Sequence, residues 1–393
     1  LLIFVRKFKL MEKLIRITTV PISIEKLLEN QPKYFSKFFD ITIVSSDKSE
    51  LEKLGKKQGV KTFCLPLTRK ITPFKDIIAI FKLYFFLKRE NPKIVHSHTP
   101  KAGFVGMTAS FFAGVPIRMH TVAGLPLMER KFIKKKVLIF IEKLTYLFAT
   151  NVYSNSKKLM EFILSKKFCS KRKIKTLANG SSNGIDTKYF SDNISLISKN
   201  KLLDTLKILK NDFVFCYVGR VVKDKGINEL VSAFNELNLK NKNCKLIIVG
   251  KIENETNPVS KSTMGIIKKN KNILLTGFKN DVRPYLSIGN CFVFPSYREG
   301  FPNVLMQAGA MDLPCIATNI NGCNEIIQDN INGFLIPPKN IDALVKAMQK
   351  IMDKKLIIKL SKNSRLMVKE KYDQKYFWKK LLIEYNNLVK CTL

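Results

Sequence analysis

Two short stretches of this sequence combine residue types that suit the binding of an anion. In the first, Arg220 and Lys225 follow an apolar run at 213–218, where a guanidinium and an ammonium are good partners for phosphate. In the second, the segment 293–308 passes from an apolar strand end through a turn into a helical pattern. Free N–H groups and the dipole at a helix start attract negative charge. We therefore expect these stretches to hold a diphosphate.

Two polar side chains of the second stretch are spaced to contact a ligand. Glu299 lies in the turn, and Gln307 follows two helical turns later on roughly the same face. One side chain could then contact a sugar and the other a ribose. The same residues also fit a plain buried strand, turn and helix with a surface carboxylate, and Arg220 and Lys225 fit a solvated basic loop.

All three histidines lie at predicted strand ends in the first half of the chain. His96 and His98 occur in the segment 94–103, and His120 occurs in 117–124. A lone histidine at a strand end is more often structural, but this clustering favours a site. A nucleophile elbow of the G-x-S-x-G kind is absent, so the histidines do not indicate a serine hydrolase.

The spacing of cysteines and histidines does not indicate a metal site. The eight cysteines show no C-x-x-C pattern, and three histidines are too few for an ordinary zinc site. Cys216, Cys244 and Cys291 lie in apolar runs and are expected to be small buried residues of a reducing compartment. We expect neither a metal nor an organic cofactor.

Length and composition predict a folded protein of two domains. The chain has 393 residues, of which 46% are hydrophobic and 25% charged. Apolar runs alternate with helical patterns, which is typical of an α/β fold with two doubly wound, Rossmann-like domains and a cleft between them. Residues 176–186 are rich in Gly, Asn and Ser and mark the junction. We expect domains at 1–190 and 191–370, with 371–393 as a helix that packs back on the first.

The pattern predicts individual elements as follows. Strands are expected at 14–20, 41–45, 62–67, 93–96, 116–120, 151–154, 213–218, 245–249, 272–275, 291–294 and 314–317. Helices are expected at 24–38 with an interruption near Pro32, and at 73–89, 103–112, 131–149, 156–165 and 356–390.

The net charge of +38 favours an anionic partner. Nucleic acid, anionic lipid and phosphorylated substrates all fit this charge, but the motifs of common nucleic-acid-binding folds are absent. Segments 81–89 and 132–146 mix basic and bulky apolar residues as interfacial helices do, although core-facing helices with solvated lysines would look the same.

Neither a membrane span nor a secretion signal is expected from the sequence. Apolar runs all fall short of about 18 residues, the length needed to span a bilayer. Residues 1–5 are too short for a signal-peptide core. Because residue 1 is not Met, residues 1–10 are interpreted as a start-site artefact, with Met11 as the true beginning.

From about Leu14 onward the chain resembles the bacterial family 4 glycosyltransferases, which have the GT-B architecture. The motifs that carry the resemblance are IVHSHTPKAG (94–103), RMHTVAG (118–124), NGSSNGID (179–186), GRVVKDKGI (219–227) and the segment 295–327. Enzymes of capsule, O-antigen or glycan-precursor assembly, which extend a sugar on a polyprenyl diphosphate, are the most similar.

The resemblance implies a role for each matching residue. The residues expected at the donor diphosphate are Arg220, Lys225, Gly300, Phe301, Pro302, Asn303 and Val304. Glu299 is expected to contact the transferred sugar and His120 to lie near it, as the catalytic pair. Gln307 is expected at the ribose, with Gly277 and Phe278 at the base, and His98, Lys101 and Gly103 on the acceptor side.

Two departures from the family pattern stand out. Gln307 replaces the second Glu of the Glu-x7-Glu motif, so a charge-assisted bond to ribose is lost. Residues 18–23 replace the Gly-rich loop that many relatives carry after the first strand.

The resemblance implies a metal-independent retaining transferase that moves a hexosyl or N-acetylhexosaminyl group. The expected donor is a nucleotide sugar, in particular a UDP-sugar, and the expected acceptor is a lipid-linked or other glycan of capsule or lipopolysaccharide. The protein would be cytoplasmic and peripheral on the anionic inner face of the plasma membrane, with no nucleic-acid partner. A UDP-sugar epimerase of the same architecture, a charge-driven nucleic-acid-binding protein and an inactive relative with Gln307 remain alternatives.

Overall fold

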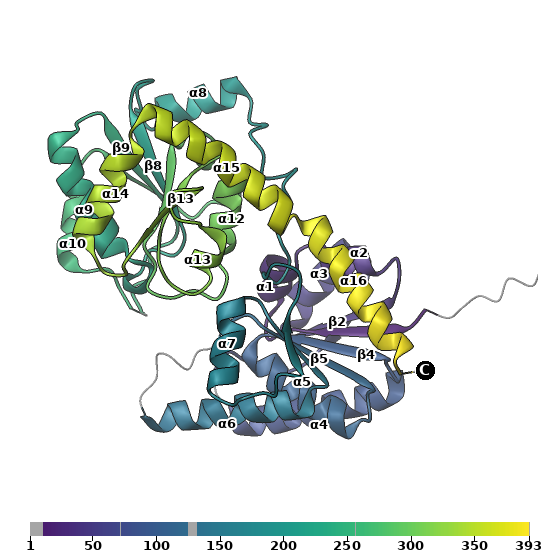
Figure 1. Cartoon of the computed structure of the whole chain (residues 1–393). Helices are drawn as coiled ribbons and strands as arrows, with labels where there is room; N and C mark the ends of the chain where they lie inside the picture. The colour runs from purple at the N-terminus through teal and green to yellow at the C-terminus, as the bar shows by residue number, and fades with distance from the viewer. Residues whose placement is uncertain (1–10, 71, 125–131, 256, 393) are drawn as a thin grey trace, which may run out of the picture. The chain divides into compact units, whose positions relative to one another are not determined.

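The structure, a computed structural model, describes residues 11–70, 72–124, 132–255 and 257–392. It divides into two compact units, Leu1–Asn183 with Phe377–Leu393 and Gly184–Tyr376 (Figure 1). The sequence analysis places the domain boundaries after residues 190 and 370. The expected start-site artefact at 1–10 lies outside the described residues. Each unit is a parallel sheet with helices packed on it, so the predicted α/β class is confirmed.

The described part of the first unit forms a seven-stranded parallel sheet in the order β3-β2-β1-β4-β5-β6-β7. The strands are β1 (Lys13–Ile17), β2 (Asp40–Ser45), β3 (Lys61–Cys64), β4 (Ile94–His98), β5 (Ile117–Val122), β6 (Asn151–Ser154) and β7 (Ile174–Thr176). The chain winds outward from β1 on one side and from β4 on the other. The carboxyl ends of β1 and β4 therefore flank the switch point of the sheet, where ligands bind in such folds.

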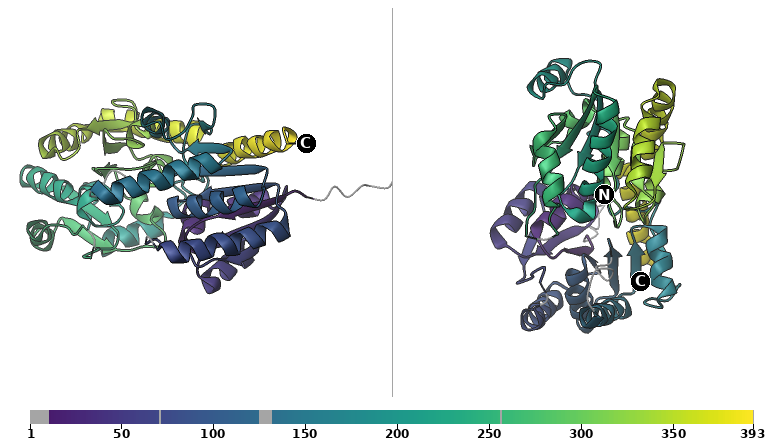
Figure 2. Two further views of the ribbon diagram at one scale, coloured as in Figure 1. Left: turned by 90° about the horizontal axis from the view of Figure 1, so that it is seen from below. Right: turned by 90° about the vertical axis from the view of Figure 1, so that its left-hand side faces the viewer.

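Two helical layers cover the faces of this sheet. On one face lie α4 (Pro73–Glu90), α5 (Pro100–Phe112), α6 (Phe132–Phe148) and α7 (Lys157–Ser165). On the other lie α1 (Pro21–Ser23), the π-helix η1 (Ile24–Leu28), α2 (Gln31–Phe35), α3 (Lys48–Gln58) and α16 (Gln374–Lys390). Figure 2 shows α4, α5 and α6 side by side. Residues of β1 alternate between the two faces of the sheet. Ile15 and Ile17 pack in the core under α4 to α7, and Leu14 packs in the core on the face of α16.

The last helix, α16, is part of the first unit. In this helix, the indole Nε1 of Trp378 donates to Oδ1 of Asn183 at 2.7 Å, and the hydroxyl of Tyr385 lies 2.7 Å from Nδ1 of His96. Both side chains are buried in the core of this face. The C-terminal segment thus completes a core that begins at the other end of the chain.

The described residues of the second unit form a six-stranded parallel sheet in the order β10-β9-β8-β11-β12-β13. The strands are β8 (Phe213–Val218), β9 (Cys244–Val249), β10 (Ile273–Gly277), β11 (Cys291–Phe294), β12 (Cys315–Thr318) and β13 (Gly333–Ile336). The helices are α8 (Leu196–Thr205), the 3-10 turn η3 (Lys223–Lys225), α9 (Ile227–Lys240), α10 (Lys261–Lys269), α11 (Arg283–Ser287), α12 (Asn303–Ala310), α13 (Cys323–Ile326), α14 (Ile341–Ile351) and α15 (Lys354–Tyr372). The switch point of this sheet lies between β8 and β11.

The structure corrects the predicted elements at several ends. The first strand stops at Ile17, and the helix expected at 24–38 is broken at Glu29, whose φ of +46° is incompatible with a helix. The helix expected at 356–390 is two helices separated at Asp373. Cys216, Cys244 and Cys291 are buried as predicted, and all eight cysteines are free thiols. Among the described residues, no helix has both the length and the apolar character to cross a membrane.

Candidate active site

Two loops of the second unit are held together at its switch point. One follows β8 and contains η3, and the other, residues 295–302, follows β11. The backbone N–H of Tyr297 donates to the carbonyl of Asp224 at 2.9 Å, and the guanidinium of Arg298 contacts the Asp224 carboxylate at 2.7 Å. These bonds make one rigid structure from two loops that are about seventy residues apart in sequence.

Lys225 and Glu299, both expected at the site from the sequence, are in direct contact. The ammonium of Lys225 lies 2.5 Å from a carboxylate oxygen of Glu299, and the two side chains are 18% and 13% exposed. Each group sits in a loop that follows a central strand at the carboxyl edge of the sheet. An ammonium that can take a phosphate oxygen therefore lies beside a carboxylate that can accept hydrogen bonds from sugar hydroxyls.

Gly226 sets the distance between these loops. Its φ is +73°, and a Cβ atom at this position would lie 2.0 Å from the carbonyl oxygen of Pro295. Only glycine satisfies both the backbone conformation and the close approach. The residue directly after Lys225 thus brings the first loop against the second.

Arg220 follows β8 but takes a different partner. Its Nη1 lies 3.0 Å from the carboxylate of Glu253, and the two side chains are 52% and 33% exposed. Exposed ion pairs contribute about 0–1 kcal/mol, so a phosphate could replace Glu253 at small cost. Glu253 has no signal in the sequence, because a single Glu in a polar loop forms no pattern.

The start of α12 follows β11 through a turn, as the sequence predicts, and its role at the diphosphate stays a prediction. Phe301 and Pro302 are buried, and the Phe301 ring packs edge-on against Tyr372 with 5.5 Å between ring centroids. The N-cap residue of α12, Pro302, makes no side-chain hydrogen bond to the helix start. The first N–H groups of a helix have no acceptor within the helix, so they suit an anion. Gln307 is half-buried on the second turn of the same helix.

The two residues expected at the nucleobase lie at the carboxyl end of β10, where Gly277 is the last residue of the strand. Gly277 has a φ of +73°, with nothing within 4 Å of the place a Cβ atom would take. Phe278, the next residue, is 65% exposed. An exposed aromatic ring beside open space suits the stacking of a base. Their role at the base stays a prediction.

In the first unit, His120 and Gly103 are in contact. His120 lies on β5 with Nδ1 2.8 Å from the Ser97 hydroxyl, and a Cβ atom on Gly103 would lie 2.4 Å from its ring. Burial lowers the pKa of His120 to about 4, so the imidazole is neutral at neutral pH. The ring is held in one orientation by β4 on one side and α5 on the other.

His98 is buried deeper than the sequence suggested. Its Nε2 accepts a hydrogen bond from the guanidinium of Arg16 at 2.9 Å, and Arg16 in turn donates to Gln31 at 2.8 Å. Burial, with the charge of Arg16 nearby, holds the pKa of His98 well below its ordinary value. Arg16 was missed in the sequence analysis, although a single arginine in an apolar strand is a visible signal.

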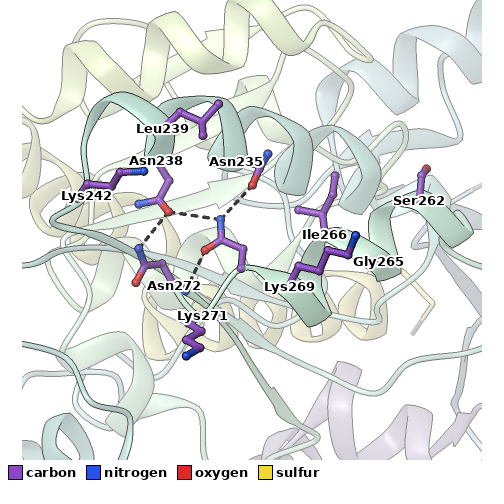
Figure 3. A pocket seen from close by; sticks show the side chains of 11 residues that line it. Asn235, Asn238, Leu239, Lys242, Ser262, Gly265, Ile266, Lys269, Lys271 and Asn272 are labelled. Carbon is purple, nitrogen blue, oxygen red and sulfur yellow. Dashed lines mark hydrogen bonds between the residues drawn. The ribbon is translucent and has the colours of Figure 1, made fainter.

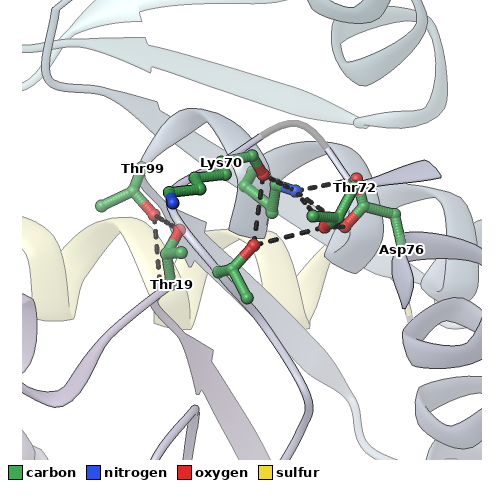
Figure 4. A network of polar contacts seen from close by, with 7 residues as sticks. Thr19, Lys70, Thr72, Asp76 and Thr99 are labelled. Atoms are coloured by element: carbon green, nitrogen blue, oxygen red, sulfur yellow. Dashed lines mark hydrogen bonds and ion pairs between the residues drawn. The ribbon is translucent and has the colours of Figure 1, made fainter. Parts of the chain in front are cut away.

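Lys101 is already engaged with a carboxylate. Its ammonium lies 2.7 Å from Asp76 and 3.1 Å from the hydroxyl of Thr72, and it also donates to the carbonyl of Lys70 (Figure 4). Both members of the ion pair are largely buried. The contact ties the start of α5 to the start of α4, so Lys101 has a structural role besides the acceptor role that the resemblance implies.

Thr99 has a strained backbone at the carboxyl end of β4. Its φ is +83°, which a β-branched residue rarely adopts and which costs about 1–3 kcal/mol. Thr19, which follows β1, holds it through a hydroxyl contact of 2.7 Å, and Figure 4 shows the two side chains pointing at each other. Such strain is concentrated at functional sites. Both residues lie at the switch point, Thr99 within the motif 94–103 and Thr19 within the segment 18–23, but the sequence predicts no contact between them.

A buried carboxyl in the first unit gives a prediction about pH. Glu142 on α6 is 3% exposed, and burial raises its pKa from 4.5 to about 7. Because the pKa is higher in the folded state, the folded state binds more protons, and stability falls as the pH rises from about 4.5 through about 7. Glu142→Gln should remove this dependence, so the variant gains about 2 kcal/mol relative to the natural protein between pH 5.5 and pH 8.5. Urea unfolding of both proteins at pH 5.5 and pH 8.5 measures this difference in stability. If the free energy of unfolding changed equally with pH in both proteins, the prediction would be wrong.

No group of three or more metal-binding side chains is found among the residues that the structure describes.

Comparison with known proteins gives the family. The model of the glycosyl transferases group 1 matches residues 198–371, and that of the glycosyl transferase 4-like domain matches 36–180. The chain is 34% identical to the capsular polysaccharide biosynthesis glycosyltransferase CapM of Staphylococcus aureus, over 96% of this chain and 98% of that protein. It is 32% identical to the UDP-Gal:alpha-D-GlcNAc-diphosphoundecaprenol alpha-1,3-galactosyltransferase of Escherichia coli, over 83% and 84%.

The fold is also found among solved structures. Anabaena HepE in complex with UDP has a TM-score of 0.79 and 18% identity, over 96% of this chain and 100% of that one. The sequence relatives cover nearly the whole length, and the two parallel sheets match the architecture expected from the motifs. The chain therefore belongs to the family 4 glycosyltransferases, which have the GT-B fold.

Proposed function

We propose that this glycosyltransferase moves a sugar from a UDP-sugar to a lipid-linked glycan of surface polysaccharide, with retention of anomeric configuration. The observation that carries the proposal is the contact of Lys225 with Glu299 at the switch point of the second unit. The printed names of the two relatives, one a capsular enzyme and one acting from UDP-Gal on a diphosphoundecaprenol, support the donor and acceptor classes.

In the proposed reaction, fixed positive groups stabilise the departing nucleoside diphosphate. Lys225 and Arg220 supply full charges, and the start of α12 supplies N–H groups and its dipole. This set provides the charge neutralisation that a metal ion supplies in other transferases. Glu299 holds the sugar, and the leaving diphosphate assists deprotonation of the acceptor hydroxyl. His120, neutral at pH 7 because of its burial, orients or polarises groups near the sugar without adding charge.

The test is a transfer assay with the full chain, a panel of UDP-sugars and a polyprenyl diphosphate that carries one sugar. Transfer that depends on the acceptor, with an α-linked product from an α-linked donor, is expected. Interconversion of UDP-sugars without acceptor would instead identify an epimerase. Tight RNA or DNA binding that is unchanged in Lys225→Ala, with no transfer, would identify the charge-driven alternative.

The proposal includes docking on an anionic membrane through α4. Four large apolar side chains of this helix, Phe74, Ile78, Phe81 and Phe85, are between 50% and 83% exposed. Their spacing places them on one face of the helix. A soluble surface rarely leaves such a face uncovered, and interfacial helices bury one among lipids.

A basic stripe borders this apolar face. Lys75, Lys82 and Arg89 recur every seven residues, and all three are exposed. Each basic residue near an anionic surface contributes about 1 kcal/mol. On α6, Phe140 and Leu147 are also exposed, with the basic Lys143 between them. Charge and apolar area thus occur together on this layer.

Replacing Phe81 and Phe85 by Asp should weaken binding to phosphatidylglycerol vesicles by at least about tenfold, because each phenylalanine contributes about 1.5–3 kcal/mol when buried. Co-sedimentation with vesicles measures the loss. Ile358→Asp with Leu366→Asp, on α15 of the other unit, makes the same charge change at exposed apolar residues and should bind normally. Equal loss in both double variants would show that net charge alone drives binding.

A further inference from the structure

A hollow of about 660 Å³ lies on the second unit (Figure 3), and none of its lining residues belongs to the site described above. It is formed by the last turns of α9, by α10 and by the residues that lead into β10. The contacts of Lys225 and Glu299 do not involve any of these residues. Two features of its lining, an ordered set of amides and a group of lysines, indicate a ligand.

Four asparagines form a connected chain along the hollow. Nδ2 of Asn270 donates to Oδ1 of Asn235 at 3.0 Å and of Asn238 at 3.3 Å, and Nδ2 of Asn272 donates to Oδ1 of Asn238 at 3.0 Å. Asn238 is only 5% exposed, and its own amide donates to the carbonyl of Asn241. The amides are therefore fixed in orientation. Because Oδ1 of Asn235 accepts from Asn270, the NH2 group is the part of this amide that can donate to a ligand.

Three lysines surround these amides in Figure 3: Lys242, Lys269 and Lys271. All three are exposed, and no carboxylate of the described chain lies within ion-pair distance of them. Three like charges on one hollow repel each other and attract an anion. The lining therefore offers neutral donors and acceptors in the middle and positive charge at the rim.

Gly265 keeps the hollow open. It lies in the interior of α10, where glycine costs about 1 kcal/mol relative to alanine. Nothing lies within 4 Å of the place its Cβ atom would take, so packing does not require glycine there. The residue lines the hollow, and any side chain at this position would project into it.

The hollow is separate from the donor site. Helix α9 begins at Ile227, two residues after Lys225, and ends at Lys240, beside the hollow. With 14 residues it is about 20 Å long. The hollow also lies near the amino ends of β9 and β10, whereas the donor residues lie at the carboxyl edge of the sheet. The donor residues and the hollow therefore lie at opposite ends of α9.

We propose that this hollow binds an acidic saccharide, a glycan segment with carboxylate groups, independently of sugar transfer. Amides pair with sugar hydroxyls, lysines pair with carboxylates, and Leu239 and Ile266 give apolar walls for the C–H faces of sugar rings. The lining holds no aromatic ring on which nucleobases could stack, which disfavours single-stranded nucleic acid. A glycan ligand follows from the proposed function, because a polysaccharide enzyme meets its own product.

Calorimetry with the full chain and no nucleotide sugar tests the proposal. The probes are an oligogalacturonate hexamer, the neutral maltohexaose and inorganic phosphate. The acidic hexamer should bind at least tenfold more tightly than either of the others. Lys242→Ser with Lys269→Ser and Lys271→Ser should weaken it at least tenfold, and Gly265→Phe, which fills the hollow and leaves every lysine, should do the same.

A matched control uses three exposed lysines of α14 and α15 in the same unit. Lys346→Ser with Lys354→Ser and Lys359→Ser makes an identical charge change and should bind the hexamer normally. Equal weakening in this control, or unchanged binding in Gly265→Phe when its folding is intact by circular dichroism, would overturn the proposal. Because binding is read without donor, a negative transfer assay would refute the proposed function and leave this result unaffected.

Discussion

Lys225→Ala and Glu299→Ala should each lower the rate of sugar transfer by at least about two orders of magnitude. Lys225 is expected to stabilise charge that develops on the leaving diphosphate, and that stabilisation is largest in the transition state. Both side chains come from loops that are fixed by bonds between Tyr297, Arg298 and Asp224, so neighbouring groups cannot move in to replace them. Steady-state kinetics with saturating acceptor measure the loss in kcat and KM separately.

The matched control for this prediction is Lys223→Ala. Lys223 lies in the same 3-10 turn as Lys225 but is exposed, and its replacement by Ala removes the same positive charge as Lys225→Ala does. Its turnover should stay within about threefold of the natural protein, since a surface charge has little effect on a site it does not contact. The double variant of Lys225 and Glu299 should lose less than the product of the two single effects, because the residues are in contact. Near-normal turnover in both single variants would refute the site.

Gly226→Ala should destabilise the second unit by at least about 3 kcal/mol and abolish donor binding. Alanine at a φ of +73° costs about 1–2 kcal/mol by itself. The added methyl group would also overlap the carbonyl of Pro295, which directly follows β11, so the loops must separate. Thermal and urea unfolding measure the first effect, and calorimetry with UDP measures the second.

Gly277→Ala separates the cost of backbone strain from the cost of the overlap with Pro295. Gly277 has the same φ of +73° in the same unit, but nothing lies within 4 Å of its added methyl group. We expect a loss of only about 1–2 kcal/mol there, from backbone strain alone. If the two variants were equally stable, the close approach of Gly226 to Pro295 would have no energetic role, and the argument for a rigid junction would fail.

Most strands could be predicted because a buried parallel strand is an apolar run. FVFCYV at β8 and KLIIV in β9 are examples, and both were placed within one residue. Two edge strands, β7 and β13, were missed. The first has three residues with a lysine at its centre, and the second begins with a glycine, so neither shows a run or an alternation.

The site was only partly predictable. Motifs indicated Lys225 and Glu299, and strand order then explains why they meet. The partners of the other charged residues depend on how segments that are distant in sequence pack against each other, and sequence gives no signal for this. Glu253 beside Arg220 and Asp76 beside Lys101 are two such cases. For Gln307, the sequence predicts weaker donor binding than with Glu, because a charge-assisted bond to ribose is lost.

The placement of α16 in the first unit has a consequence for protein synthesis. Trp378 and Tyr385 fill a core whose other walls are made from the first strands. On the ribosome, the whole second unit emerges before these side chains do. The half that is translated first can therefore finish folding only after the half that follows it, and a chain shortened by its last helix should expose that unfinished core to proteases while the later half stays intact.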